Sequence, residues 1–87
     1  MNQIITLTIG SKEFKFNVST NDYNGYINDI MPNNKVAPAH NLVMRTVDES
    51  NKKELRELID KSPGAALQIA GLLQQEFAPA LEISVKK

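Results

Sequence analysis

Few side chains in this sequence could support acid–base, nucleophilic or metal chemistry. The single histidine, His40, follows Pro38 at the start of a stretch with helical spacing. An imidazole can act as a base or bind a metal, but a metal site needs further ligands at compatible spacing, and none cluster around His40 in the sequence. No acidic residue follows it closely before Asp48, and no Gly-x-Ser-x-Gly motif is present. We therefore interpret His40 as a surface or helix-terminal residue.

The residues needed for other kinds of catalytic or ligand-binding site are also missing from the sequence. The sequence has no cysteine, which excludes disulfides, thiolate-bound metals and thiol nucleophiles. The glycines stand apart, at positions 10, 25, 64 and 71, and form no phosphate-binding loop. The carboxylates around Asp48 and Glu57 are typical of solvated helix ends and ion pairs. We predict no catalytic residue, no metal and no cofactor; a small enzyme with a site shared across an oligomer interface is the remaining catalytic alternative.

The charge balance narrows the classes of partner. Ten Lys and Arg residues balance ten Asp and Glu residues, whereas nucleic-acid-binding proteins usually carry a basic excess that displaces phosphate counterions. We therefore predict no nucleic-acid partner and assign the aromatic side chains to the core. The N-terminus lacks a signal-peptide pattern, and no stretch approaches 18 apolar residues, so we expect a cytoplasmic protein without a membrane partner. A net charge of zero leaves a homo-oligomer open.

Residues that alternate between apolar and polar predict strands at both ends of the chain. Residues 3–9 and 12–18 alternate on either side of Gly10-Ser11, which predicts a β-hairpin with a type II′ turn. Near the C-terminus, residues 81–85 alternate again, with Leu81, Ile83 and Val85 on one face. This pattern predicts a third strand.

Apolar residues at helical spacing predict four helices between these strands. Ser19-Thr20 offers the first N-cap, and Met31-Pro32 ends that helix. The other three are expected at 39–47, at 52–61 and, after a start at Ser62-Pro63, at 65–77. The order β-β-α-α-α-α-β predicts one α+β domain over residues 1–87, with a small three-stranded sheet covered by helices on one face.

Five segments carry a resemblance to a known family. They are Met1–Gly10, Asp22–Asn24 with Tyr26–Asn28, Met31–Asn41, Pro63–Ala70 and Glu76–Pro79. In these segments the sequence resembles the small tail assembly chaperones of tailed bacteriophages and prophages, and the resemblance covers essentially the whole chain. Met31–Asn41 is its most distinctive part.

The resemblance implies a non-enzymatic protein of the bacterial host cytoplasm that is absent from the mature virion. Such chaperones bind the tail tape measure protein, keep it soluble and help to recruit the tail tube protein. The family brings no catalytic residues. The alternative from another class is a small prophage-encoded regulatory or adaptor protein that binds or inhibits a host protein.

Two segments are candidates for binding a partner. The Met31–Asn41 stretch combines apolar residues with two prolines, and it is either a rigid connector or an exposed recognition loop on a rigid scaffold. The helix expected at 65–77 is rich in Ala and Leu and could accept an amphipathic helix. The candidate partner-binding residues are Met31, Pro32, Asn33, Asn34, Lys35, Val36, Ala37, Pro38, His40, Leu72 and Gln75.

Overall fold

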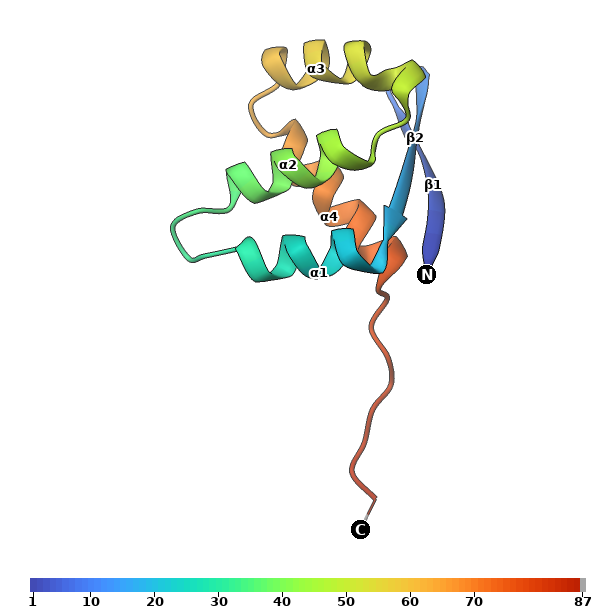
Figure 1. The fold of residues 1–87 in the computed structure, drawn as a ribbon, viewed down its shortest axis with the longest axis vertical. Coiled ribbons are helices and arrows are strands. Elements are labelled where there is room, and N and C mark those ends of the chain that lie inside the picture. Colours follow the sequence, from blue (N-terminus) through green and yellow to red (C-terminus); the bar gives the residue numbers. More distant parts are fainter. Residues whose placement is uncertain (87) are drawn as a thin grey trace.

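The computed structural model describes residues 1–86 and has the α+β class expected from the sequence (Figure 1). Its elements, in chain order, are β1 (Asn2–Ile9), β2 (Lys12–Ser19), α1 (Thr20–Asp29), α2 (Val36–Thr46), the short 3₁₀ helix η1 (Glu49–Asn51), α3 (Lys52–Lys61) and α4 (Ala65–Phe77). The hairpin and the four α-helices predicted from the sequence are therefore confirmed as elements. The second helix, expected at 39–47, instead spans Val36–Thr46, so residues 36–38 of the expected loop are helical.

The hairpin follows from alternation and from the residues of its turn. β1 and β2 pair antiparallel along their whole length, from Asn2 opposite Ser19 to Ile9 opposite Lys12. Gly10 has a φ of 65°, and it is the only described residue with a positive φ. A positive φ at the first turn position alone fits the type II′ turn predicted for Gly10-Ser11 and matches the twist of the strands.

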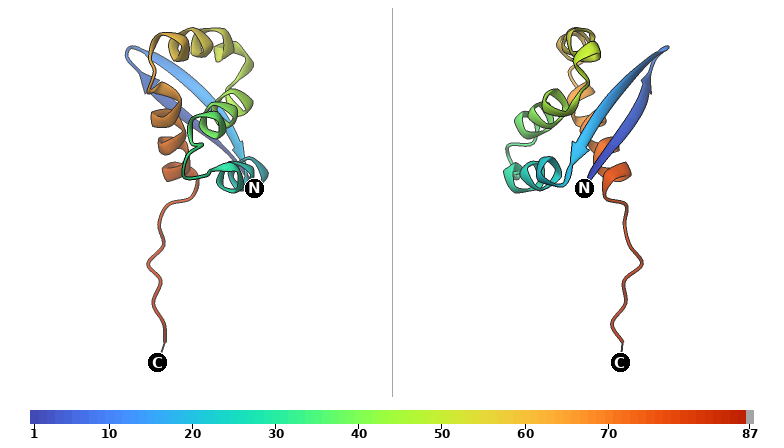
Figure 2. Two further views of the ribbon diagram at one scale, coloured as in Figure 1. Left: turned by 90° about the vertical axis from the view of Figure 1, so that its left-hand side faces the viewer. Right: turned by 45° about the vertical axis from the view of Figure 1, so that its right-hand side comes forward.

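All the helices lie on one face of the hairpin, and the core fills the space between (Figure 2). Apolar side chains of β2 point into it, and Phe16 is completely buried. On the helical side, α4 buries the face that its spacing predicts: Ala66, Ile69, Ala70 and Leu73. The opposite face of the hairpin is exposed and includes Ile4. The core is therefore one layer between the hairpin and the helices.

The helix starts agree only in part with the sequence-based expectation. Ser19 caps α1 as predicted: its hydroxyl accepts a hydrogen bond from the Asp22 N–H while the Asp22 carboxylate accepts one from the Ser19 N–H, each at 3.0 Å. The start of α4 at Ser62-Pro63 was wrong. Ser62 instead ends α3, because its N–H donates to the Leu58 carbonyl at 3.0 Å, and α4 begins only at Ala65.

The predicted C-terminal strand and three-stranded sheet do not form in this structure. Among the described residues the sheet has two strands, and residues 79–86 form neither helix nor strand. Beyond α4 the chain runs away from the folded body (Figure 1). Alternation alone predicted the strand, but a strand also requires an adjacent strand edge to satisfy its backbone groups, and this segment meets none.

Candidate functional site

The segment between α1 and α2 is a hydrogen-bonded turn. The Met31 N–H donates to the Asn34 carbonyl at 3.2 Å, and the Asn34 N–H donates to the Met31 carbonyl at 3.0 Å. Pro32 stands at the second position of this turn, where its fixed φ is favourable. The turn therefore has a defined shape before any partner binds, which reduces the conformational entropy lost on binding.

This turn borders a shallow hollow of about 350 Å³. The hollow is lined by Asn28, Asp29, Met31, Asn34, Ala37, Pro38 and Asn41. Met31 and the nearby Val36 are large apolar side chains that are each 57% exposed. The hollow and these two side chains form the turn surface, which offers apolar contact area with polar groups beside it.

The predicted partner-binding residues lie on two separate surfaces. Most of them belong to the turn or to the start of α2, with Asn33 and Lys35 exposed beside Val36. His40 is also exposed on α2 but does not line the hollow. Leu72 and Gln75 are exposed on α4, and Leu72 lines a different groove that shares no residue with the turn surface.

That second groove lies between β1 and α4 and has a volume of about 330 Å³. It is lined by Gln3, Ile4, Ile5, Thr6, Leu7, Leu72 and Glu76. Leu72 is 49% exposed, and Ile4 is 70% exposed on the outer side of the hairpin. Periodicity could not place Leu72 beside β1, because it does not define how α4 is oriented against the sheet.

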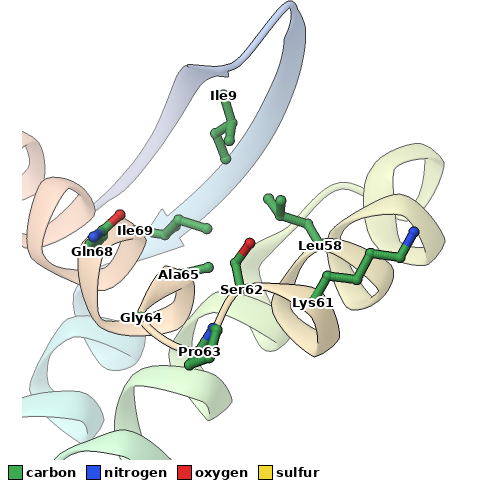
Figure 3. A pocket seen from close by; sticks show the side chains of 9 residues that line it. All are labelled: Ile9, Leu58, Lys61, Ser62, Pro63, Gly64, Ala65, Gln68 and Ile69. Atoms are coloured by element: carbon green, nitrogen blue, oxygen red, sulfur yellow. The ribbon is translucent and has the colours of Figure 1, made fainter.

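A third hollow lies under the tip of the hairpin, and the sequence analysis did not anticipate it (Figure 3). It measures about 390 Å³ and is lined by Ile9, Leu58, Lys61, Ser62, Pro63, Gly64, Ala65, Gln68 and Ile69. Ile9 points from the hairpin toward α4, whereas the Lys61 side chain extends away from the hollow (Figure 3). A smaller adjoining hollow of about 250 Å³ is lined partly by the Lys12–Glu54 ion pair. Neither hollow gathers acid, base and nucleophile in one place.

Two titratable groups have shifted pKa values, and each shift has a local cause. Burial raises the pKa of the Tyr26 phenol. Hydrogen bonds from the Ser50 hydroxyl and the Ser50 N–H lower the pKa of the Asp48 carboxyl, and the nearby Lys15 charge adds to this effect. The two groups sit on different elements, with Tyr26 in α1 and Asp48 capping η1. Both shifts are therefore explained by packing and capping.

Neither a metal cluster nor a membrane span is found in the part of the chain that the structure describes. No group of three or more His, Asp or Glu side chains within residues 1–86 is arranged to hold a metal ion. No helix between β1 and the last described residue has the length and apolar character needed to cross a bilayer.

Comparison with known proteins relates these surfaces to a family. A family model described as phage tail assembly chaperone matches residues 5–87. The chain belongs to the phage tail assembly chaperone family. The match includes the turn surface, α4 and the C-terminal segment, so every surface described above lies within or overlaps the matched region. Family membership indicates a role in tail assembly.

This tail assembly chaperone is also similar to a protein of Haemophilus phage HP1 (strain HP1c1). The two are 33% identical over 82 residues, which cover 94% of this chain and 79% of the relative. The relative is described as an uncharacterized 11.3 kDa protein in the lys 3′ region. No solved structure matches the chain. The tail assembly chaperone thus has a phage-encoded relative that aligns with nearly all of its length.

Proposed function

We propose that this chain binds the tail tape measure protein during tail morphogenesis and keeps it soluble until the tail assembles around it. In this role it is not an enzyme. It acts in the cytoplasm of the bacterial host, helps to bring in the tail tube protein and leaves before the virion is mature. Membership in the tail assembly chaperone family supports the general role.

The exposure of Met31 on a preorganised turn and of Val36 at the adjacent start of α2 is the observation that supports partner binding most directly. A tape measure protein is expected to be long and helical, with apolar stripes that aggregate if they stay exposed. An amphipathic helix binds a complementary surface through apolar side chains at helical spacing. Methionine suits such a surface because its flexible thioether adapts to different side chains. We propose the turn surface as the principal contact for the tape measure protein.

The exposed face of α4 is the second proposed contact. Leu67 and Leu72 are 41% and 49% exposed, and Gln75 lies on the same helix. Both leucines lie outside the buried stripe that holds α4 against the core. They are therefore available to a partner without loss of the fold.

Co-expression with the tape measure protein of the same genome tests the proposal. We expect affinity capture to recover a complex, and we expect the tape measure protein to be soluble only when this chain is present. A folded chain that neither captures nor solubilises the tape measure protein would contradict the proposal. The regulatory or adaptor role would then be tested against host proteins.

Paired aspartate substitutions test the turn surface. Met31→Asp with Val36→Asp should weaken capture at least tenfold, because burying each side chain is worth about 1.5–3 kcal/mol and a carboxylate opposes that burial. Asn21→Asp with Asn24→Asp, at two exposed positions of α1, is the control for the same added negative charge. Circular dichroism should show both variants folded. Wild-type capture by the double variant would exclude the turn surface and leave α4 as the contact.

A further inference from the structure

The two edges of the hairpin differ in how their backbone groups are satisfied. On the β2 edge, the Lys15 carbonyl accepts a hydrogen bond from the Asp48 N–H at 2.8 Å, and the Lys15 N–H donates to the Asn51 side chain at 3.0 Å. The Glu13 carbonyl accepts a hydrogen bond from the Asn51 amide at 3.3 Å. The β2 edge is therefore partly covered by the segment that follows α2.

The β1 edge has no such cover among residues 1–86. Lys15 and Glu13 point their backbone groups away from β1, so their cross-strand partners Thr6 and Thr8 point theirs away from β2. Alternation along the strand adds Ile4 to this outward set. An open edge of this kind is a template for pairing with another strand.

The C-terminal segment 79–86 has the properties of the missing strand. Its apolar side chains Leu81, Ile83 and Val85 alternate with polar ones and are 77%, 81% and 82% exposed. Added to the β1 edge, these three side chains would cover the groove lined by Leu7 and Leu72, and the polar side chains would continue the exposed face of the hairpin.

Charge favours one direction for the added strand. Among the described residues, Glu76 is the only charged one that lines the groove. It lies near the C-terminal end of α4, at the same end of the molecule as the start of β1 (Figures 1 and 2). In an antiparallel strand with Ile83 opposite Ile5, Lys86 lies opposite Asn2. The positive charge of Lys86 is then at the same end of the groove as the negative charge of Glu76. This register places Ala80 at the other end, opposite Thr8.

A chain cannot place its own C-terminal segment in this direction. The segment leaves α4 at the Asn2 end of β1 (Figure 1), and β1 extends roughly 24 Å from there to Ile9, at about 3.4 Å per residue. Ala80 is only three residues beyond Phe77, the end of α4, which allows about 10 Å. Within one molecule only a parallel arrangement is within reach.

We propose that the β1 edge binds the C-terminal segment 79–86 of a second copy of this chain as an antiparallel strand. Reciprocal exchange of the two segments closes a two-fold symmetric dimer. This interaction uses neither the turn surface nor a tail protein, so self-association and tape measure binding are measured separately. It does cover Leu72, which is also part of the second proposed contact.

Disulfide trapping between two single-cysteine variants tests the pairing, and the absence of native cysteine makes it unambiguous. Thr8→Cys mixed with Ala80→Cys should form an intermolecular disulfide under mild oxidation, because directly opposed residues in the proposed pairing have Cα atoms about 5.5 Å apart, within disulfide range. Thr8→Cys mixed with Lys86→Cys is the matched control and should form at least tenfold less heterodisulfide, as read by mass spectrometry.

Sedimentation equilibrium of tail variants supplies the second measurement. Ile83→Asp should weaken self-association at least tenfold, whereas Ser84→Asp, which adds the same charge on the opposite face, should change it less than threefold. Neither position contributes to the core, so both variants keep the fold. A wild-type chain that stays monomeric at millimolar concentration would overturn the proposal. So would equal trapping in the two cysteine mixtures, or a Thr8–Lys86 disulfide within one doubly substituted chain.

Discussion

The strand β2 and the C-terminal segment 79–86 share an alternating pattern but have opposite environments. In β2, Phe14, Phe16 and Val18 are 3%, 0% and 2% exposed. In the C-terminal segment, the corresponding run of Leu81, Ile83 and Val85 is about four-fifths exposed. Both runs place apolar residues at every second position, so the pattern itself does not explain the difference.

The difference lies in what surrounds each run. β2 pairs with β1 on one edge, the Val47–Asp48 segment bridges to its other edge, and the helices cover its apolar face. Within residues 1–86, the C-terminal segment has no equivalent neighbour. Alternation therefore determines which side chains share a face, whereas a partner edge determines whether a strand forms.

Truncating a large side chain in each region should give the largest difference in the free energy of unfolding. Phe16→Ala should lower the free energy of unfolding by about 3–5 kcal/mol, because Phe16 is fully buried and its loss leaves a cavity. Ile83→Ala should change it by less than about 0.5 kcal/mol, since this position makes no core contact. Urea denaturation at the lowest usable protein concentration measures both values.

Equal losses of unfolding free energy in the two variants would contradict this difference between the regions, because they would mean that Ile83 is buried in the monomer. A loss for Ile83→Ala that grows with protein concentration would instead support it, since that dependence is the signature of an interface between chains.

Two glycine substitutions compare the hairpin turn between β1 and β2 with the middle of α4. Gly10→Ala should cost about 1–2 kcal/mol, because a φ of 65° is unfavourable for a residue with a Cβ. Gly71→Ala should instead stabilise the chain by about 0.5–1 kcal/mol, since Gly71 is an exposed residue in the middle of α4. An added Cβ meets no atom within 4 Å at either position, so thermal unfolding of the pair isolates the backbone effect.

The smallest expected effect is at the covered edge of β2. The pKa of Asp48 is lowered in the folded state, so its carboxylate stabilises the fold above the ordinary pKa of 3.8. That contribution is lost as the pH falls through the lower folded-state value. Asp48→Asn should therefore flatten the pH dependence of unfolding below pH 3.8. An unchanged slope in acid titrations followed by circular dichroism would show that Ser50 does not hold this carboxylate in solution.

The candidate surfaces were predictable only in part. The turn surface could be anticipated because Met31 directly precedes Pro32 and Val36 lies between Pro32 and Pro38, so both are apolar residues of a proline-containing segment. The groove beside β1 could not, because Leu72 meets the strand only through the angle at which α4 crosses the hairpin. The hollow under the hairpin tip has the same origin, since Ile9 and Ile69 are far apart in sequence.

Local chemistry in the sequence determined the hairpin, its turn at Gly10, the cap at Ser19 and the buried face of α4, because each depends on residues close together in the chain. Tertiary structure decided which apolar side chains stay exposed, which hollows form and that residues 79–86 remain unpaired in the single chain. Those outcomes depend on whether distant segments can satisfy each other's backbone groups and apolar surfaces. The spacing of residues along one segment does not contain that information.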